Sequence, residues 1–417
     1  MKKVLGIVIA LAMVASCLAG FSVSAEEPTL SDDFVIEGTK LVKYVGSDMN
    51  VVIPDGITEI GGGAFNFCSQ IVSVEIPSSV EIIGNGAFYS CSSLETVDVP
   101  SSVTIIDEYA FAYCDLLETV NIAEGVMIIE SSAFYSCYAL EFVNIPNSVT
   151  TIGSGAFMYC RSLVSVDIPS SVIFIDNGIF SYCYSLEEIN VSLDNANYSS
   201  VGGVLFNKNQ TELVRYPIKK AGSTYVIPSS VTTIEYDAFA CCYSLETMDI
   251  PEGVETIGFS AFEDCWLLKS VSIPSSVEII GAHTFNGCTS LETVNIAEGV
   301  ALIADGAFEE CTSLKYVYIP ASVKEIQNEW VPPFDKTTTL IVNKDSYAHQ
   351  WAVRYEQPYT LLFISSIDSM QDVFNLLKLI VSGVEPSAEQ IAVADFVKDG
   401  ELTAADALAA MKIVMNK

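Results

Sequence analysis

The feature that most constrains the fold of this chain is a cysteine that recurs every 23 residues. A phenylalanine precedes each cysteine of the series by three positions. A fixed period between about 20 and 50 residues is typical of solenoids, in which one repeat forms one coil and buries its apolar side chains only against its neighbours. We therefore predict a solenoid. The ten cysteines are Cys68, Cys91, Cys114, Cys137, Cys160 and Cys183, then, after a gap of 59 residues, Cys242, Cys265, Cys288 and Cys311.

One repeat, residues 92–114, reads "SSLETVDVPSSVTIIDEYAFAYC". Its segment "LETVDV" alternates apolar and polar residues, which predicts a short strand, and "SVTII" predicts a second strand after a turn at Pro100. The segment "AFAYC" is too short for a stable helix, so we expect a helical turn there. The predicted coil is thus mainly β, of the leucine-rich repeat type, and stacks on its neighbours at about 4.8 Å.

In such a stack the ten cysteines form one column of side chains that point the same way. A disulfide needs Cβ atoms about 3.8 Å apart with suitable vectors, which column neighbours do not provide, although an exported protein could hold a disulfide framework. A free cysteine packs as a small apolar residue. We therefore predict ten reduced, buried thiols and no metal site, since His283 and His349 stand alone. Cys241, beside the column, is expected to be a partly exposed thiol.

The N-terminus predicts export. Lys2 and Lys3 precede an apolar stretch that ends at Val23-Ser24-Ala25, which is typical of a signal peptide over residues 1–25. The segment "VASC" leaves an alternative, a lipoprotein in which Cys17 carries the lipid. No later stretch reaches the roughly 18 apolar residues of a membrane span.

The charge of the chain argues against several partners. There are 52 acidic and 19 basic residues, for a net charge of −33. Nucleic acid needs clustered Lys and Arg, and anionic lipid surfaces repel such a protein. We expect a soluble extracellular protein that binds no nucleic acid.

No catalytic constellation is present in the sequence. The two histidines are far apart, and there is no Ser-His-Asp order, glycine-rich phosphate loop or HExxH. We therefore predict that the chain is not an enzyme. Paired carboxylates of a glycosidase stay open as an alternative, but the acids share one strand position with amides, which favours solvated outward residues or a polar binding strip. These residues are Glu75, Asp98, Asp167 and Asp249 with Asn121, Asn144, Asn190 and Asn295.

Aromatic residues gather around the cysteine turn, although Ser, Asp or Gly occupy the same positions in other coils. Tyrosine is amphipathic and favours interfaces, where it binds proteins or stacks on sugar rings. We predict a ligand-binding stripe; the alternative is that the rings pack on one another along the edge of the solenoid. The stripe consists of Tyr89, Tyr113, Tyr135, Tyr138, Tyr159, Tyr182, Tyr184, Tyr243 and Trp266.

Residues 145–169, "IPNSVTTIGSGAFMYCRSLVSVDIP", resemble the BspA-like leucine-rich repeats of bacterial surface proteins. The resemblance covers roughly residues 35–360 and implies a secreted or cell-surface protein that adheres to host proteins, other cells or glycans. It also implies the domain plan. We expect an N-terminal cap (26–60), repeats (61–190), a long hairpin-bearing repeat (191–227), repeats (228–336) and a C-terminal cap (337–363) with a short helix near 346–355.

Residues 364–417 form a different, helical module. The segment "DFVKDGELTAAD" fits a twelve-position calcium loop with a glycine at position 6, although Val397 at position 3 supplies no ligand. It predicts one Ca²⁺. The predicted ligands are Asp395, Asp399, Glu401, Thr403 and Asp406.

This module resembles a degenerate type I dockerin, which implies calcium-dependent binding to a cohesin on a scaffold protein. The first of the two loops of the family has lost its ligands here. The resemblance assigns the cohesin contacts to Ala404 and Ala405, with Met370 and Gln371 as the first-loop pair. The alternative is a two-helix tail that packs on the solenoid cap.

Together these features predict a secreted, non-catalytic binding or adhesion protein. Its solenoid presents a surface to a protein or glycan ligand, and its tail tethers it to a scaffold. The alternatives are a cellulosome-associated component that binds or degrades polysaccharide, and a passive surface spacer.

Overall fold

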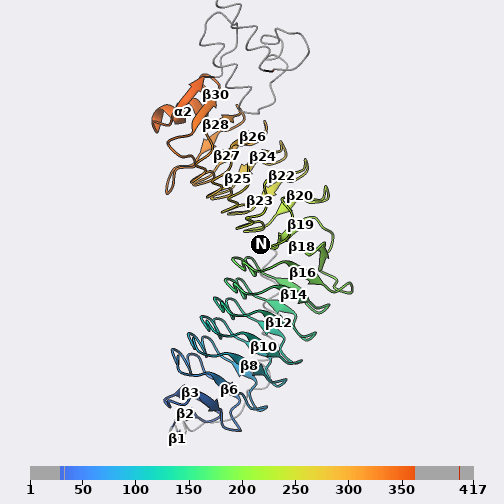
Figure 1. The fold of residues 1–417 in the computed structure, drawn as a ribbon, viewed down its shortest axis with the longest axis vertical. Coiled ribbons are helices and arrows are strands. Elements are labelled where there is room, and N and C mark those ends of the chain that lie inside the picture. The colour runs from blue at the N-terminus through green and yellow to red at the C-terminus, as the bar shows by residue number, and fades with distance from the viewer. Residues whose placement is uncertain (1–28, 32, 362–402, 404–417) are drawn as a thin grey trace, which may run out of the picture.

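The computed structural model describes residues 29–31, 33–361 and 403, and these form a mainly β solenoid of about 14 coils. Figure 1 shows the coils stacked along the long axis, with the N-terminal coils at one end and helix α2 at the other. Within the described residues, α2 (Tyr347–Arg354) is the one helix. The predicted solenoid is confirmed.

The first arc of each coil is the longer strand. These strands pair in parallel and in register, so that Val97, Val120 and Val143 lie above one another and are buried. In the N-terminal half they are β4 (Asn50–Val52), β6 (Ser73–Glu75), β8 (Thr96–Val99), β10 (Thr119–Ile122), β12 (Phe142–Asn144), β14 (Ser165–Ile168) and β16 (Glu188–Val191). In the C-terminal half they are β20 (Thr224–Val226), β22 (Thr247–Asp249), β24 (Ser270–Ile273), β26 (Thr293–Ile296), β28 (Tyr316–Ile319) and β30 (Thr339–Val342).

The second arc is a strand of two residues, of which one side chain faces the core. Its isoleucine column, for example Ile106 and Ile129, is buried. These strands are β5 (Glu59–Ile60), β7 (Ile82–Ile83), β9 (Ile105–Ile106), β11 (Ile128–Ile129), β13 (Thr151–Ile152) and β15 (Phe174–Ile175), then β21 (Thr233–Ile234), β23 (Thr256–Ile257), β25 (Ile279–Ile280), β27 (Leu302–Ile303) and β29 (Glu325–Ile326).

The turn arc, residues 107–114 in one coil, closes each coil. Its backbone N–H groups donate alternately within the coil and to the next coil: Ala110 N–H donates to Asp107 O (3.1 Å) and Phe111 N–H to Ala133 O (2.8 Å). Tyr109 and Tyr113, five residues and one residue before the cysteine, have φ of 56° and 60°. Such left-handed residues stop the turns from continuing as an α-helix, so the expected helical turn takes the form of successive tight turns.

The phenylalanine and cysteine of the repeat form two adjoining columns in the core. Successive rings from Phe65 to Phe180 stack at centroid distances of 4.8–5.8 Å. Eight of the buried thiols donate a hydrogen bond to the carbonyl oxygen of the phenylalanine in the preceding coil, as from Cys114 Sγ to Phe88 O (3.3 Å). The same oxygen accepts the N–H of its own coil's cysteine, Cys91 (3.2 Å). The described cysteines are all free, as predicted.

Burial of the thiols follows the prediction with two exceptions. Cys68, in the first coil, is half-buried because the cap covers it incompletely. Cys241 was expected to be partly exposed, and this prediction is wrong: it is 1% exposed. It occupies the left-handed position before Cys242 (φ 63°) and is hydrogen-bonded to the side chain of Tyr243, so an aromatic side chain covers it.

Both ends of the stack are covered. At the N-terminus β2 (Phe34–Glu37) and β3 (Lys40–Tyr44) form an antiparallel hairpin, to which β1 (Thr29–Ser31) adds. At the C-terminus β31 (Tyr359–Leu361) pairs with β30, and α2 packs Trp351 against Phe334, which ends the phenylalanine column. The aromatic columns are therefore not open to solvent at either end.

The long repeat divides the core in two. Strands β17 (Tyr198–Val201), β18 (Val204–Asn207) and β19 (Glu212–Arg215) form an antiparallel insertion, seen as the green hairpin beyond the stack in Figure 1. The buried apolar residues form one cluster before the insertion and a second one after it. Leu205 belongs to the first cluster and its neighbour Val204 to the second.

A buried polar link joins the two halves at this insertion. Ser181 Oγ donates to Asp237 Oδ2 (2.9 Å). The Arg215 guanidinium donates to the carbonyl oxygens of Asp237 and Ala240. Asp237 Oδ1 and Arg215 Nε have no hydrogen-bond partner among the described residues. Burial raises the pKa of Asp237 to about 6, and the nearby Arg215 charge opposes this rise.

The phenylalanine column generates a stability prediction. Phe134→Ala removes a fully buried ring and should lower the free energy of unfolding by about 3–5 kcal/mol. Phe67→Ala, which removes a ring that is 67% exposed, should change it by about 0.5 kcal/mol or less. Guanidinium denaturation followed by circular dichroism measures both, and equal losses would contradict the stacked core.

The buried link generates a pH prediction. Because the folded state holds the Asp237 proton more tightly than an unfolded chain, where the pKa is about 3.9, this residue destabilises the fold near pH 7. That penalty disappears as pH falls through 6 toward 4. The free energy of unfolding of the wild type minus that of Asp237→Asn should therefore increase by about 2–3 kcal/mol when the pH is lowered from 7 to 4. Parallel pH curves for the two proteins would refute this.

Candidate functional site

The candidate site is a row of aromatic rings along the outer edge of the turn arcs, here called the aromatic edge. Neighbouring rings lie 4.2–6.4 Å apart between centroids without interruption. The structure thus brings together eight of the nine predicted residues and adds one that the sequence analysis missed, Phe67. In order the row is Phe67, Tyr89, Tyr113, Tyr135, Tyr159, Tyr182, Tyr184, Tyr243 and Trp266.

The position of each ring within its repeat explains the angle between its plane and that of the neighbouring ring. Tyr89 and Tyr135 stand two residues before their cysteine, whereas Tyr113 and Tyr159 stand one residue before it. Rings from alternating positions meet at 60–78°. Tyr159 and Tyr182 occupy the same position in successive coils, and their rings stack at 4.5 Å and 6°.

The aromatic edge continues across the insertion that divides the core. Tyr184, Tyr243 and Trp266 each follow their cysteine directly. The ring of Tyr243 lies 6.1 Å from that of Tyr184 and 4.2 Å from that of Trp266. The two halves of the solenoid therefore present one common surface.

Three hydroxyl groups of the aromatic edge, those of Tyr159, Tyr182 and Tyr243, have raised pKa values and remain neutral over the physiological pH range. Burial raises the pKa of Tyr159 to about 12, and it raises the pKa values of Tyr182 and Tyr243 well above the usual value near 10. Side-chain hydrogen bonds join Tyr184 to Tyr243. These groups can donate and accept hydrogen bonds, but they do not act as nucleophiles or bases at neutral pH.

The interior rings of the aromatic edge are partly covered by their neighbours. The interior tyrosines are half-buried, and each contacts a ring on both sides. The two end residues differ: Phe67 is 67% exposed and Trp266 is 47% exposed. Such half-buried, pre-positioned tyrosines are typical of surfaces that bind another protein.

Tyr138 lies outside the row of rings and contacts an arginine. The guanidinium carbon of Arg161 lies 4.5 Å from the centroid of the Tyr138 ring and 5.7 Å from that of Tyr184. Arg161 was also missed in the sequence analysis. The signal was present, because Arg161 directly follows Cys160 and so shares the repeat position of both tyrosines.

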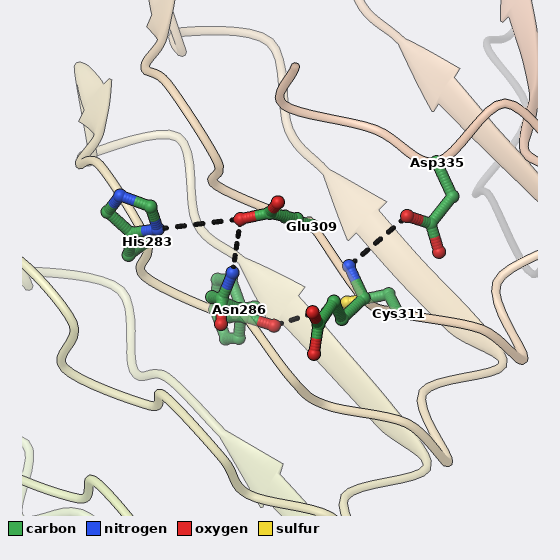
Figure 2. Close-up of polar contacts among 7 residues, drawn as sticks. His283, Asn286, Glu309, Cys311 and Asp335 are labelled. Carbon is green, nitrogen blue, oxygen red and sulfur yellow. Dashed lines mark hydrogen bonds and ion pairs between the residues drawn. The ribbon is translucent and has the colours of Figure 1, made fainter. Parts of the chain in front are cut away.

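The same edge becomes acidic beyond Trp266. Figure 2 shows Glu309 with two partners: Asn286 Nδ2 donates to Glu309 Oε2 (2.7 Å), and His283 Nδ1 lies 3.9 Å from that oxygen. Burial raises the pKa of Glu309, and the His283 charge opposes the rise. Asp335 Oδ1 accepts the N–H of Glu310 (3.2 Å). Among the described residues no group of three His, Cys, Asp or Glu side chains could hold a metal ion.

The acids and amides of the first-arc strands lie on the exposed face, where a solvated column was expected. Asn121 Nδ2 donates to Asp98 Oδ1 (2.7 Å), and Asn190 Nδ2 donates to Asp167 Oδ1 (3.2 Å). Asp98 and Asn121 are exposed. Amides that neutralise neighbouring carboxylates are typical of a strand surface that faces water.

The predicted calcium and cohesin residues lie in the tail. Thr403 is described and half-buried. The others, Asp395, Asp399, Glu401, Ala404, Ala405 and Asp406, lie outside the described residues.

Comparison with known families identifies the repeat. The model of the BspA type leucine rich repeat region matches six copies, over residues 43–164, 127–220 and 219–332. The chain belongs to the BspA-type leucine-rich repeat family. No curated protein gives a significant match.

Three solved structures share the fold. A leucine rich cell surface protein from Faecalibacterium prausnitzii is 29% identical with a TM-score of 0.63, covering 80% of this chain and 98% of that one. A leucine-rich repeat protein from Eubacterium ventriosum is 25% identical with a TM-score of 0.55, covering 74% and 94%. The pneumococcal vaccine antigen PcpA, 19% identical with a TM-score of 0.56, covers 81% and 99% and supports the fold alone.

Within the part of the chain that the structure describes, no helix has the length and apolar character needed to cross a bilayer.

Proposed function

We propose that this BspA-type protein is a secreted, non-catalytic binding protein of the bacterial surface whose aromatic edge binds a protein ligand. The observation that carries the proposal is the unbroken row of rings from Phe67 to Trp266. Rigid tyrosines lose little conformational entropy on binding and supply both apolar contact and hydrogen bonds. The similarity to a leucine rich cell surface protein supports the surface location.

A protein ligand fits this surface better than a sugar chain does. Stacking on a sugar ring requires a free aromatic face, and the stacked pairs Tyr159–Tyr182 and Tyr184–Tyr243 place one face of each ring against the other. Their hydroxyls and ring edges remain available, which suits the mixed polar and apolar surface of a protein.

One observation favours a second candidate, a carbohydrate ligand. Trp266 ends the row and is 47% exposed, and one of its faces stacks on Tyr243. The residue at its position in the next coil, Thr289, is small. A single sugar ring could stack there, as in a polysaccharide-binding component of a cellulosome-like assembly.

The double variant Tyr159→Ala/Tyr182→Ala tests the proposal. It removes the stacked pair at the centre of the aromatic edge, so binding to a responsive extracellular-matrix protein in a plate-bound panel should fall at least tenfold, equivalent to about 1.4 kcal/mol. Phe142→Ala/Phe174→Ala is the matched control, since both phenylalanines are exposed on other faces, and it should bind normally.

The same panel separates the candidates. A glycan array that responds while the protein panel stays silent, with loss of signal on Trp266→Ala, would favour the carbohydrate ligand. Hydrolysis of plant polysaccharide, abolished by a single acid-to-amide change, would refute the non-catalytic assignment.

We further propose that the C-terminal tail binds one Ca²⁺ and tethers the solenoid to a cohesin-bearing scaffold. The support is the spacing of the oxygen-bearing residues from Asp395 to Asp406 around Gly400.

Calorimetry tests the tail. Titration of the full chain with Ca²⁺ should give a one-site heat that Asp395→Ala removes and that Asp98→Ala, on the exposed solenoid strand, leaves in place. Calcium should also be needed for capture by immobilised cohesins. A heat unchanged by Asp395→Ala would refute the assigned loop.

A further inference from the structure

Arg161 occupies a special place in the aromatic edge. It projects from the turn arc between the coils of Tyr138 and Tyr184, and its guanidinium lies over the rings of both (4.5 and 5.7 Å). Arg161 is exposed. A planar guanidinium held against aromatic rings keeps its N–H donors directed in its own plane, and stacking restricts its rotamers.

Arg161 has no carboxylate within ion-pair distance among the described residues, although acids outnumber bases in this chain. Several other cations on the solenoid surface contact an acid or a carbonyl: Lys40 pairs with Glu59 (2.5 Å), Lys269 with Glu246 (2.5 Å), and Lys336 donates to the carbonyl of Tyr355 (2.6 Å). Among the residues that directly follow a cysteine of the repeat, the acid nearest to Arg161 is Asp115, two coils away. Tyr138 lies between them. At about 4.8 Å per coil this is roughly 10 Å.

We propose that Arg161 is a recognition point for a carboxylate, and that the protein partner of the aromatic edge inserts an Asp or Glu side chain there, beside an aromatic or apolar residue. This inference rests on the proposed function and names the chemistry of its ligand. The guanidinium would donate two parallel hydrogen bonds to the carboxylate. The rings of Tyr138 and Tyr184 would cover the apolar neighbour and exclude water from the ion pair.

The surrounding charge restricts the partner further. A net charge of −33 repels a partner that is acidic throughout. Beyond Trp266 the same edge carries Glu309, Glu310 and Asp335. A fitting partner therefore presents one acidic group at Arg161 and basic or neutral residues toward the C-terminal half, and this polarity fixes its direction along the solenoid.

A small probe that combines a phenol ring with a carboxylate, 4-hydroxyphenylacetate, tests the assignment directly. Saturation-transfer NMR with the full wild-type chain should show binding, and the neutral amide 4-hydroxyphenylacetamide should give at least fivefold less signal. Arg161→Gln should reduce the carboxylate signal at least fivefold, and Arg161→Lys, which keeps the charge but loses the planar fork, should give an intermediate value.

Arg354→Gln is the matched control, because Arg354 also lies over a tyrosine ring (5.2 Å from Tyr355) but belongs to α2, outside the aromatic edge; it should leave the signal unchanged. Equal signals for acid and amide, or an unchanged signal in a folded Arg161→Gln protein, would overturn the carboxylate site. Loss of the carboxylate site would not by itself overturn the proposal that the aromatic edge binds a protein. That proposal is tested separately, by the loss of partner binding in Tyr159→Ala/Tyr182→Ala.

Discussion

The hydrogen bond from a cysteine thiol to the phenylalanine carbonyl of the preceding coil is the interaction on which the rest of the structure depends. Eight such bonds, 3.1–3.3 Å long, run along the stack. The same carbonyl already accepts the backbone N–H of the cysteine in its own coil, so the thiol bonds to its second lone pair. A thiol satisfies it with a weak donor while packing as an apolar group, and it thereby fixes the register of one coil on the next.

A fixed register decides what the outer positions can do. Residues two before, one before and one after each cysteine lie on the same edge in every coil, so a change at one of them alters the surface without altering the core. Tyrosines, Arg161 and the acids near Glu309 all occupy these positions. Binding chemistry is in this way added to a repeating scaffold, and a continuous surface results even where the insertion at residues 191–227 divides the core.

The period predicted the solenoid, the phenylalanine column and reduced buried thiols such as Cys114, and the family resemblance predicted the helix near Trp351. The sequence did not predict burial that depends on residues outside the repeat unit. Cys241 is covered from the tyrosine edge, and the Arg215–Asp237 link arises from the packing of the insertion between two halves, which no periodic pattern specifies. The repeat position of Arg161 can be seen in the sequence, but its contact with two tyrosine rings is seen only in the stacked structure.

The account is tested most directly by alkylation of the native protein with a bulky maleimide, followed by peptide mass spectrometry. The stacked core predicts rapid labelling of the half-buried Cys68 and protection of the cysteines from Cys91 to Cys183 and from Cys241 to Cys311 until the protein is denatured. Burial also raises the pKa of Cys91 to about 12 and that of Cys114 well above its usual value, so few thiolates are present to react at these positions. Labelling of the buried series at the rate of Cys68 in the folded protein would contradict the account.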